Sequence, residues 1–108
     1  MTDQNRIYTI DEIKEICRPI FHSRDFIYQV YLFGSYARSE ATGASDVDFM
    51  IVLNRPVGWA LYGLYDDLSE PLNKRVDIIT EDESKQFHYG NFQKDKVLIY
   101  EQEYENHV

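Results

Sequence analysis

The sequence predicts a single α/β domain in which helices and strands alternate. Two stretches carry apolar residues at helical spacing, and three others are short, apolar and rich in branched or aromatic side chains. A chain of 108 residues fits one domain, so we expect 1–108 to fold as one unit. The expected order is helix, strand, helix, strand, helix, strand, helix, followed by a segment of mixed character.

The first helix is expected directly after Thr9. Thr9 and Glu12 have the spacing of a capping box, in which each side chain accepts a hydrogen bond from the backbone of the other residue. The apolar residues of this stretch share one helical face: Ile10, Ile13, Cys17, Ile20 and Phe21. Pro19 should kink or shorten the helix, because proline lacks a backbone donor. A strand is then expected over 28–33 and ends at Gly34.

The middle of the chain predicts a short helix, a loop and a buried strand. We expect the helix over 35–40, starting at the Gly-Ser turn, and the loop over 41–45. The run 47–53 is apolar apart from Asp48, which is typical of a strand covered on both faces.

The second half of the chain predicts one more strand between two helices. Leucines at helical spacing indicate an amphipathic helix over 59–72, although Pro71 conflicts with its last turn. A strand is expected over 74–80, and a helix from 81 toward 89. The segment 97–100 fits either a short strand or a helical turn.

The composition limits the classes of ligand. Asp and Glu outnumber Lys and Arg by 19 to 11, which gives a formal charge of −8. Long nucleic acids are bound mainly through cationic side chains, so we expect no direct nucleic-acid binding. A nucleotide is compatible with this charge, because a divalent metal neutralises its phosphates. One cysteine, no secretory pattern and no long apolar run predict a cytoplasmic protein without a membrane partner.

A Gly-Ser turn followed by acidic residues is the most informative pattern. Ten residues separate Ser35 from Asp46, and Asp46 and Asp48 alternate at the start of a strand. Side chains alternate across a strand, so these carboxylates lie on one face, about 6.5–7 Å apart along the backbone. Asp77 lies in the later strand and joins them if the two strands pair. Such a cluster repels itself, and a divalent metal relieves that repulsion.

The Gly-Ser turn predicts a phosphate site opposite these acids. Gly34 has no Cβ, so the backbone can approach a phosphate, and Ser35 offers a hydroxyl and an amide. Arg38 lies one turn later and adds a cation near the same anion. A nucleoside triphosphate held in this way needs a positioned hydroxyl and a base for in-line attack on its α-phosphorus. Asp77 is the best candidate for that base.

Each part of this pattern also has an ordinary structural explanation. A Gly-Ser pair is a common turn, and an Asp-x-Asp pair at the start of a strand is usually a solvated edge or a cap. Their combination in this order is much rarer. Buried acids without partners cost several kcal/mol, so a core strand does not carry them without a function.

These residues resemble the signature of the polymerase β-like nucleotidyltransferase superfamily. The stretch 32–52, LFGSYARSEATGASDVDFMIV, is most similar to its minimal members, the MNT-type domains. The resemblance implies a small mixed sheet with helices packed on one side. The implied catalytic acids and metal ligands are Asp46, Asp48 and Asp77. The residues expected to contact the nucleotide are Gly34, Ser35, Arg38 and Ser45.

The resemblance also implies a reaction and a partner. Proteins of this type are typically encoded beside a HEPN-domain toxin, an all-helical RNase. They use ATP as substrate and Mg²⁺, with two ions expected, to transfer AMP to a tyrosine of that toxin, which silences it. We therefore expect an antitoxin that can form a hetero-oligomer with its toxin. The alternative is a stoichiometric antitoxin without transferase activity, and transfer to a small molecule such as an antibiotic ranks last.

Overall fold

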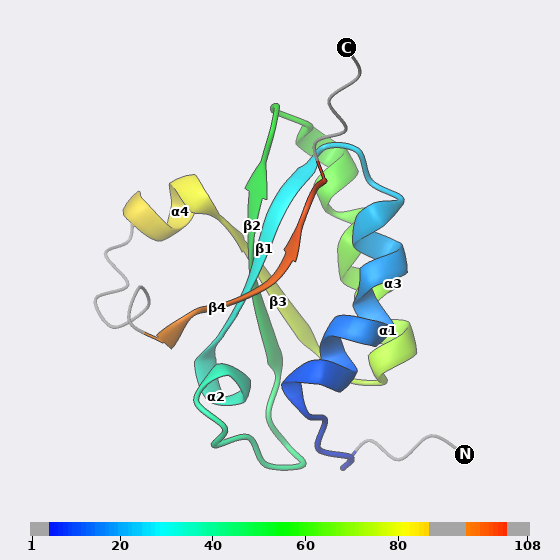
Figure 1. The fold of residues 1–108 in the computed structure, drawn as a ribbon, viewed down its shortest axis with the longest axis vertical. Helices are drawn as coiled ribbons and strands as arrows, with labels where there is room; N and C mark the ends of the chain where they lie inside the picture. Colours follow the sequence, from blue (N-terminus) through cyan, green and yellow to red (C-terminus); the bar gives the residue numbers. More distant parts are fainter. Residues whose placement is uncertain (1–4, 87–94, 104–108) are drawn as a thin grey trace.

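The computed structural model describes residues 5–86 and 95–103, with the side chains of 84–86 excepted (Figure 1). Helices and strands alternate as predicted for an α/β chain. The elements are α1 (Ile10–His22), β1 (Ile27–Phe33), α2 (Gly34–Ala37), β2 (Val47–Leu53), the 3₁₀ helix η1 (Gly58–Leu61), α3 (Gly63–Leu72), β3 (Val76–Thr80), α4 (Glu81–Gln86) and β4 (Val97–Glu101).

The four strands form one mixed sheet, as the family resemblance implies. Their order across the sheet is β3-β2-β1-β4. β1 runs antiparallel to both β2 and β4, whereas β2 and β3 run parallel. Two parallel neighbours need a crossover connection, and α3 provides it here. The crossover brings the start of β3 beside the start of β2, where the predicted acids lie.

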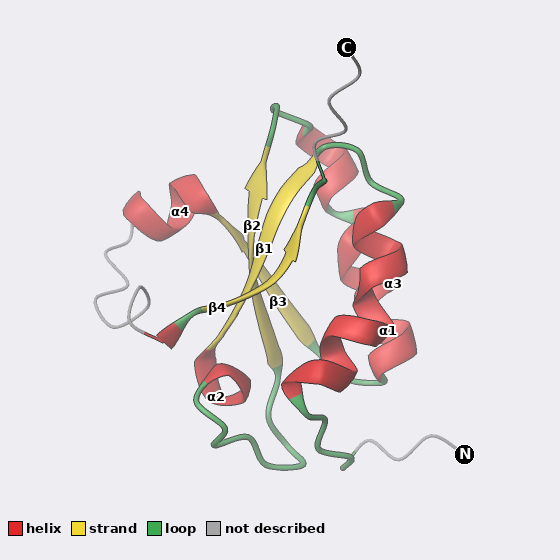
Figure 2. Ribbon diagram, in the orientation of Figure 1, coloured by secondary structure: helices red, strands yellow, loops and turns green. Residues whose placement is uncertain are grey.

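The long helices α1 and α3 lie together on one side of the sheet, and the core lies between them and the strands (Figure 2). The short helix α2 lies at one end of the sheet, where its buried Tyr36 joins the same core, and α4 lies across the sheet from α1 and α3 (Figure 1). The fully buried core residues include Ile13, Cys17, Val30, Leu32, Phe49, Ile51, Leu64 and Leu68. Helices of the described segments are all too short or too polar to cross a membrane.

The first helix begins as predicted, but it extends further than expected. The Thr9 hydroxyl accepts a hydrogen bond from the backbone of Glu12, and the Glu12 carboxylate accepts one from the backbone of Thr9. Pro19 does not shorten α1, which continues to His22. A proline near the end of a helix removes one backbone hydrogen bond, and the buried Phe21 keeps the last turn packed against the core.

The helix predicted over 59–72 is divided in two. It starts as η1, and only Gly63–Leu72 is α-helical. Leu64, Leu68 and Leu72 are fully buried at a spacing of four, whereas Trp59 is 87% exposed. Packing of the leucine face therefore enforces α-helical geometry only in the second part. Pro71 is accommodated inside the last turn of this helix.

Other boundaries shift by a few residues. The short helix predicted over 35–40 spans only Gly34–Ala37, because Ser39 adopts a left-handed conformation with φ of 59°. β3 begins at Val76 rather than at 74, since Asn73, which ends α3, is also left-handed. The segment 97–100 is a strand. The predicted extension of the last helix toward 89 lies outside the described residues.

Candidate active site

Alternation along β2 and β3 separates the core residues from the acids. Val47 and Phe49 of β2 and Val76 and Ile78 of β3 belong to the hydrophobic core. Residues between them point to the opposite face of the sheet. That face therefore carries Asp46, Asp48 and Asp77, and we call this surface the acid face.

The register of the sheet brings these carboxylates together. Asp48 of β2 lies directly opposite Asp77 of β3, and Asp46 precedes the paired residues Val47 and Val76. Asp48 is half-buried, whereas Asp77 is exposed on the edge strand. The sequence expectation that the three acids converge if the strands pair thus agrees with the observed pairing.

Burial and the neighbouring acids shift the pKa of Asp48. Burial is the largest effect, and together with the negative charges of Asp77 and Asp46 it raises the pKa of Asp48 to about 6. The positive charge of Arg38 lowers this pKa in part. All three acids therefore share one electrostatic environment. A cation at this position would reduce their mutual repulsion.

Gly34 brings the backbone of the turn against Asp48. Phe33, the last residue of β1, pairs with Asp48, so Gly34 starts α2 beside the carboxylate. Gly34 has φ of 72°, and a Cβ at this position would lie 2.3 Å from Oδ2 of Asp48. Only glycine fits here. Residues with a side chain rarely adopt this backbone conformation, and the Asp48 carboxylate already occupies the position of a Cβ. An anion bound by the turn would thus lie next to the acid face.

Ser35 is the second residue of the one-turn helix α2, and Arg38 directly follows its last residue. The carbonyl of Ser35 accepts a hydrogen bond of 2.8 Å from the backbone of Glu40, which closes the turn. Nε of Arg38 lies 3.2 Å from a carboxylate oxygen of Glu40, and its Nη1 lies 3.9 Å from Asp95. A one-turn helix has a small dipole, so any anion binding here would depend on the Gly34 backbone, the Ser35 hydroxyl and the Arg38 charge.

Residues 10–99 match the family model described as the nucleotidyltransferase domain. The chain belongs to this family. A relative from Methanocaldococcus jannaschii, whose name describes it as a candidate protein adenylyltransferase, is 38% identical over 79 residues. The match covers 68% of this chain and 79% of that relative.

Solved structures of toxin–antitoxin complexes share the fold of this nucleotidyltransferase domain. One similar chain comes from the complex of a tri-AMPylated HEPN toxin of Shewanella oneidensis with an MNT antitoxin. It has a TM-score of 0.66 and 14% identity, over 87% of this chain and 74% of that one. A toxin–antitoxin structure with AMP-PNP also has a TM-score of 0.66, with 18% identity over 89% of this chain and 76% of the other.

The acids of the nucleotidyltransferase domain suit Mg²⁺, although they do not form a closed metal site. Within residues 5–86 and 95–103, no three His, Cys, Asp or Glu side chains are placed so that they could hold an ion. Mg²⁺ is usually bound by one or two carboxylates together with substrate phosphates, rather than by an all-protein cage. The hard carboxylate oxygens of Asp46, Asp48 and Asp77 fit this pattern, with the phosphates of a nucleotide as the remaining ligands.

Ser45 has a structural contact that the sequence pattern does not indicate. Its hydroxyl accepts a hydrogen bond of 2.9 Å from the backbone of Thr42 and lies 3.4 Å from the Thr42 hydroxyl. Ser45 therefore fixes the loop that leads into Asp46. Its contact with a nucleotide stays a prediction.

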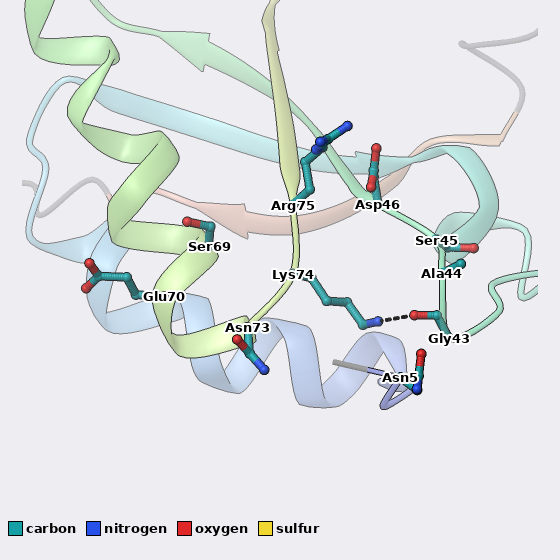
Figure 3. Close-up of a pocket in the computed structure, with 10 residues that line it drawn as sticks. All are labelled: Asn5, Gly43, Ala44, Ser45, Asp46, Ser69, Glu70, Asn73, Lys74 and Arg75. Carbon is teal, nitrogen blue, oxygen red and sulfur yellow. Dashed lines mark hydrogen bonds between the residues drawn. The ribbon is translucent and has the colours of Figure 1, made fainter. Parts of the chain in front are cut away.

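Two cationic residues near the acid face were not recognised from the sequence. Nζ of Lys74 donates a hydrogen bond of 2.9 Å to the carbonyl of Gly43, which ties the loop before Asp46 to the start of β3 (Figure 3). Arg75 follows Lys74 and is exposed. Arg75 lies two residues before Asp77, so the alternation of side chains along a strand could have placed it on the acid face. The contact of Lys74 with Gly43 depends on the conformation of the loop and has no such signal in the sequence.

Proposed function

We propose that this chain transfers AMP from ATP to a tyrosine of a HEPN-family toxin, with Mg²⁺, and thereby acts as its antitoxin. The observation that carries the proposal is the pairing of Asp48 with Asp77 beside Gly34, where a Cβ would lie 2.3 Å from the Asp48 carboxylate. The adenylyltransferase name of the M. jannaschii relative and the toxin–antitoxin complexes with the same fold support it.

The turn residues would bind the phosphates of ATP, and the residues of the acid face would bind the metal ion. Gly34 and Ser35 would hold the terminal phosphates of ATP, and Arg38 would offset their charge. Asp46, Asp48 and Asp77 would hold Mg²⁺. The bound ion would neutralise the phosphates and make the α-phosphorus more electrophilic.

The proposed transfer is an in-line displacement at the α-phosphorus. The tyrosine oxygen forms a bond to this phosphorus while the bond to the bridging oxygen of the β-phosphate breaks, and pyrophosphate leaves. The phenolic proton passes to Asp77, which is exposed and therefore accessible to an acceptor. Asp48 is half-buried between the other acids and is therefore less accessible to the acceptor hydroxyl.

Labelled ATP provides the test of this function. The chain is incubated with its HEPN-family partner, Mg²⁺ and ATP labelled at the α-phosphate, and label on the partner is measured. We expect label with the unchanged chain, and a loss of at least about 100-fold with Asp46→Asn or Asp48→Asn. Asp66→Asn, at an exposed acid on α3, is the matched control and should retain transfer.

The same experiment distinguishes the alternative function. A stoichiometric antitoxin would suppress the RNase without label reaching it, and both active-site variants would suppress it as well as the unchanged chain does. That result would reject the transferase proposal.

A further inference from the structure

A polar cavity of about 640 Å³ lies beside the acid face, at the starts of β2 and β3. Three segments line it: the loop before β2, the end of α3 with the turn that follows it, and the N-terminal segment (Figure 3). The lining residues are Asn5, Gly43, Ala44, Ser45, Asp46, Ser69, Glu70, Asn73, Lys74 and Arg75. Asp46 belongs to both the cavity and the acid face, so the cavity borders this face.

Arg75 places a positive charge at this junction. The backbone of Val47 donates a hydrogen bond of 3.0 Å to the carbonyl of Arg75, and Val47 pairs with Val76. Arg75 therefore lies opposite Asp46, two residues before the pair of Asp48 and Asp77. The Arg75 and Asp46 side chains extend in the same direction in Figure 3.

The Arg75 guanidinium makes no ion pair within the described part of the chain. The ion pairs found there use the side chains of Arg6, Arg24, Arg38 and Arg55. Lys74, the other cation of the cavity, is buried and bonded to Gly43. In a chain of formal charge −8, Arg75 is thus the exposed cation of this cavity that an incoming acidic group can reach.

The geometry of in-line displacement assigns opposite sides to the two substrates. The attacking and leaving oxygens lie on opposite sides of the transferred phosphorus. The Gly34 turn follows β1 and lies on one side of Asp48, whereas β3 lies on the other side. If pyrophosphate leaves from the turn, the acceptor must come from the side of β3. The cavity opens there, beside Asp46 and Arg75.

We propose that this cavity is the acceptor subsite, and that it takes a protein segment whose acceptor hydroxyl lies near a carboxylate. The carboxylate pairs with Arg75, and the polar lining of the cavity suits a peptide rather than an apolar small molecule. This inference rests on the proposed transfer of AMP. It adds where the acceptor binds and which chemical group is recognised.

Charge reversal at Arg75 tests the subsite. The acceptor is the HEPN-family partner, and the variants are Arg75→Glu, Arg75→Lys and the control Arg18→Glu, at an exposed arginine of α1 outside the cavity. Two quantities are measured: the KM for the partner in AMP transfer, and the Kd of a non-hydrolysable ATP analogue with Mg²⁺. We expect Arg75→Glu to raise the KM at least about tenfold, with Arg75→Lys intermediate and Arg18→Glu unchanged. The Kd for the analogue should change by less than about twofold with each variant.

Two results would overturn the subsite while AMP transfer itself stands. An unchanged KM for the partner with Arg75→Glu would remove Arg75 from acceptor recognition. A parallel loss of analogue binding and transfer would mean that the cavity holds the nucleoside of ATP instead. If the unchanged chain labels no partner at all, the proposed function fails, and the subsite fails with it. Binding of the partner to the analogue-loaded chain, measured for the same variants, separates weakened recognition from slowed chemistry.

Discussion

The absence of a side chain at Gly34 allows the turn after β1 to approach the acid face closely. The residue combines a left-handed φ of 72° with a space in which a Cβ would lie 2.3 Å from Oδ2 of Asp48. Strain and contact are separate effects here. Gly58 has a similar φ of 55° but no atom within 4 Å of the Cβ position, so it isolates the backbone strain.

We predict that Gly34→Ala lowers the free energy of unfolding by about 2–3 kcal/mol. Gly58→Ala should cost about 1 kcal/mol, because it carries only the strain of the left-handed conformation. Urea denaturation of both variants measures the difference. In an Asp48→Ala background the excess cost of Gly34→Ala should disappear. Equal costs at the two glycines in the unchanged background would contradict a close contact with Asp48.

The raised pKa of Asp48 predicts a pH dependence of stability. In the unfolded chain this carboxyl titrates near its usual value of 3.8, and in the folded protein at about 6. Between these values the folded state holds a proton that the unfolded state has lost. The free energy of unfolding of the ligand-free protein therefore falls as the pH rises through this window.

Asp48→Asn should remove this dependence. Relative to the unchanged protein, the variant should gain about 1 kcal/mol of stability between pH 4 and pH 7, after allowance for solvent screening of a half-buried group. Chemical denaturation at a series of pH values without metal gives this difference. Asp66→Asn, at an exposed acid, is the control and should show a flat difference. A flat difference for Asp48→Asn as well would mean that burial and the neighbouring acids do not raise its pKa.

At the scale of elements, the predictions from sequence succeed where local chemistry decides the structure. The capping box of Thr9 and Glu12 fixes the start of α1, and the run of β-branched and aromatic residues fixes β2 over Val47–Leu53 as expected. The predictions are less accurate where packing decides. The stretch 59–72 has leucines at helical spacing throughout, but only its second part meets the core and becomes α3.

The candidate site also combines features that are local in sequence with features that depend on packing. The acid pattern and the Gly-Ser turn are local, so the sequence predicts them and the strand pairing brings them together. The cavity beside Asp46 is built from three segments that are distant in sequence, including Asn5 and Ser69. No local pattern connects these residues. Their proximity follows from the crossover through α3, which only the folded chain reveals.

The loop before β2 depends on one such distant contact. The hydrogen bond from Lys74 to the carbonyl of Gly43 ties this loop to the segment before β3, and Lys74 is buried. Gly43 also has no room for a side chain, because a Cβ there would lie 2.7 Å from the backbone oxygen of Asn5. The position of Asp46 therefore depends on the seating of this loop.

We predict that Lys74→Met lowers the free energy of unfolding by about 1–2 kcal/mol through the loss of this bond. Amide hydrogen exchange should become faster in the loop, in particular at Ser45, whose N–H bonds to the carbonyl of Thr42. Lys14→Met, at an exposed position on α1, is the control and should leave loop exchange unchanged. Unaltered exchange with Lys74→Met would show that the loop is held by other contacts.

At the scale of the whole molecule, the charge balance predicts that nucleotide binding depends on metal. The chain has a formal charge of −8, and the acid face adds local repulsion to any phosphate that approaches. Arg38, the cation nearest the turn, already pairs with Glu40. ATP alone should therefore bind weakly. A divalent cation should strengthen its binding, because it offsets the negative charge of both the carboxylates and the phosphates.

We predict that ATP with Mg²⁺ stabilises the folded chain by about 2.7 kcal/mol when ATP is 100-fold above its Kd. Thermal unfolding measures this as a higher Tm, and EDTA should abolish most of the increase. Asp46→Asn combined with Asp48→Asn should also abolish it, whereas Asp66→Asn should retain it. If ATP raises the Tm equally with EDTA present, the nucleotide is held without a cation. The carboxylates opposite Gly34 would then need another role, because without a cation their charge repels the phosphates of ATP.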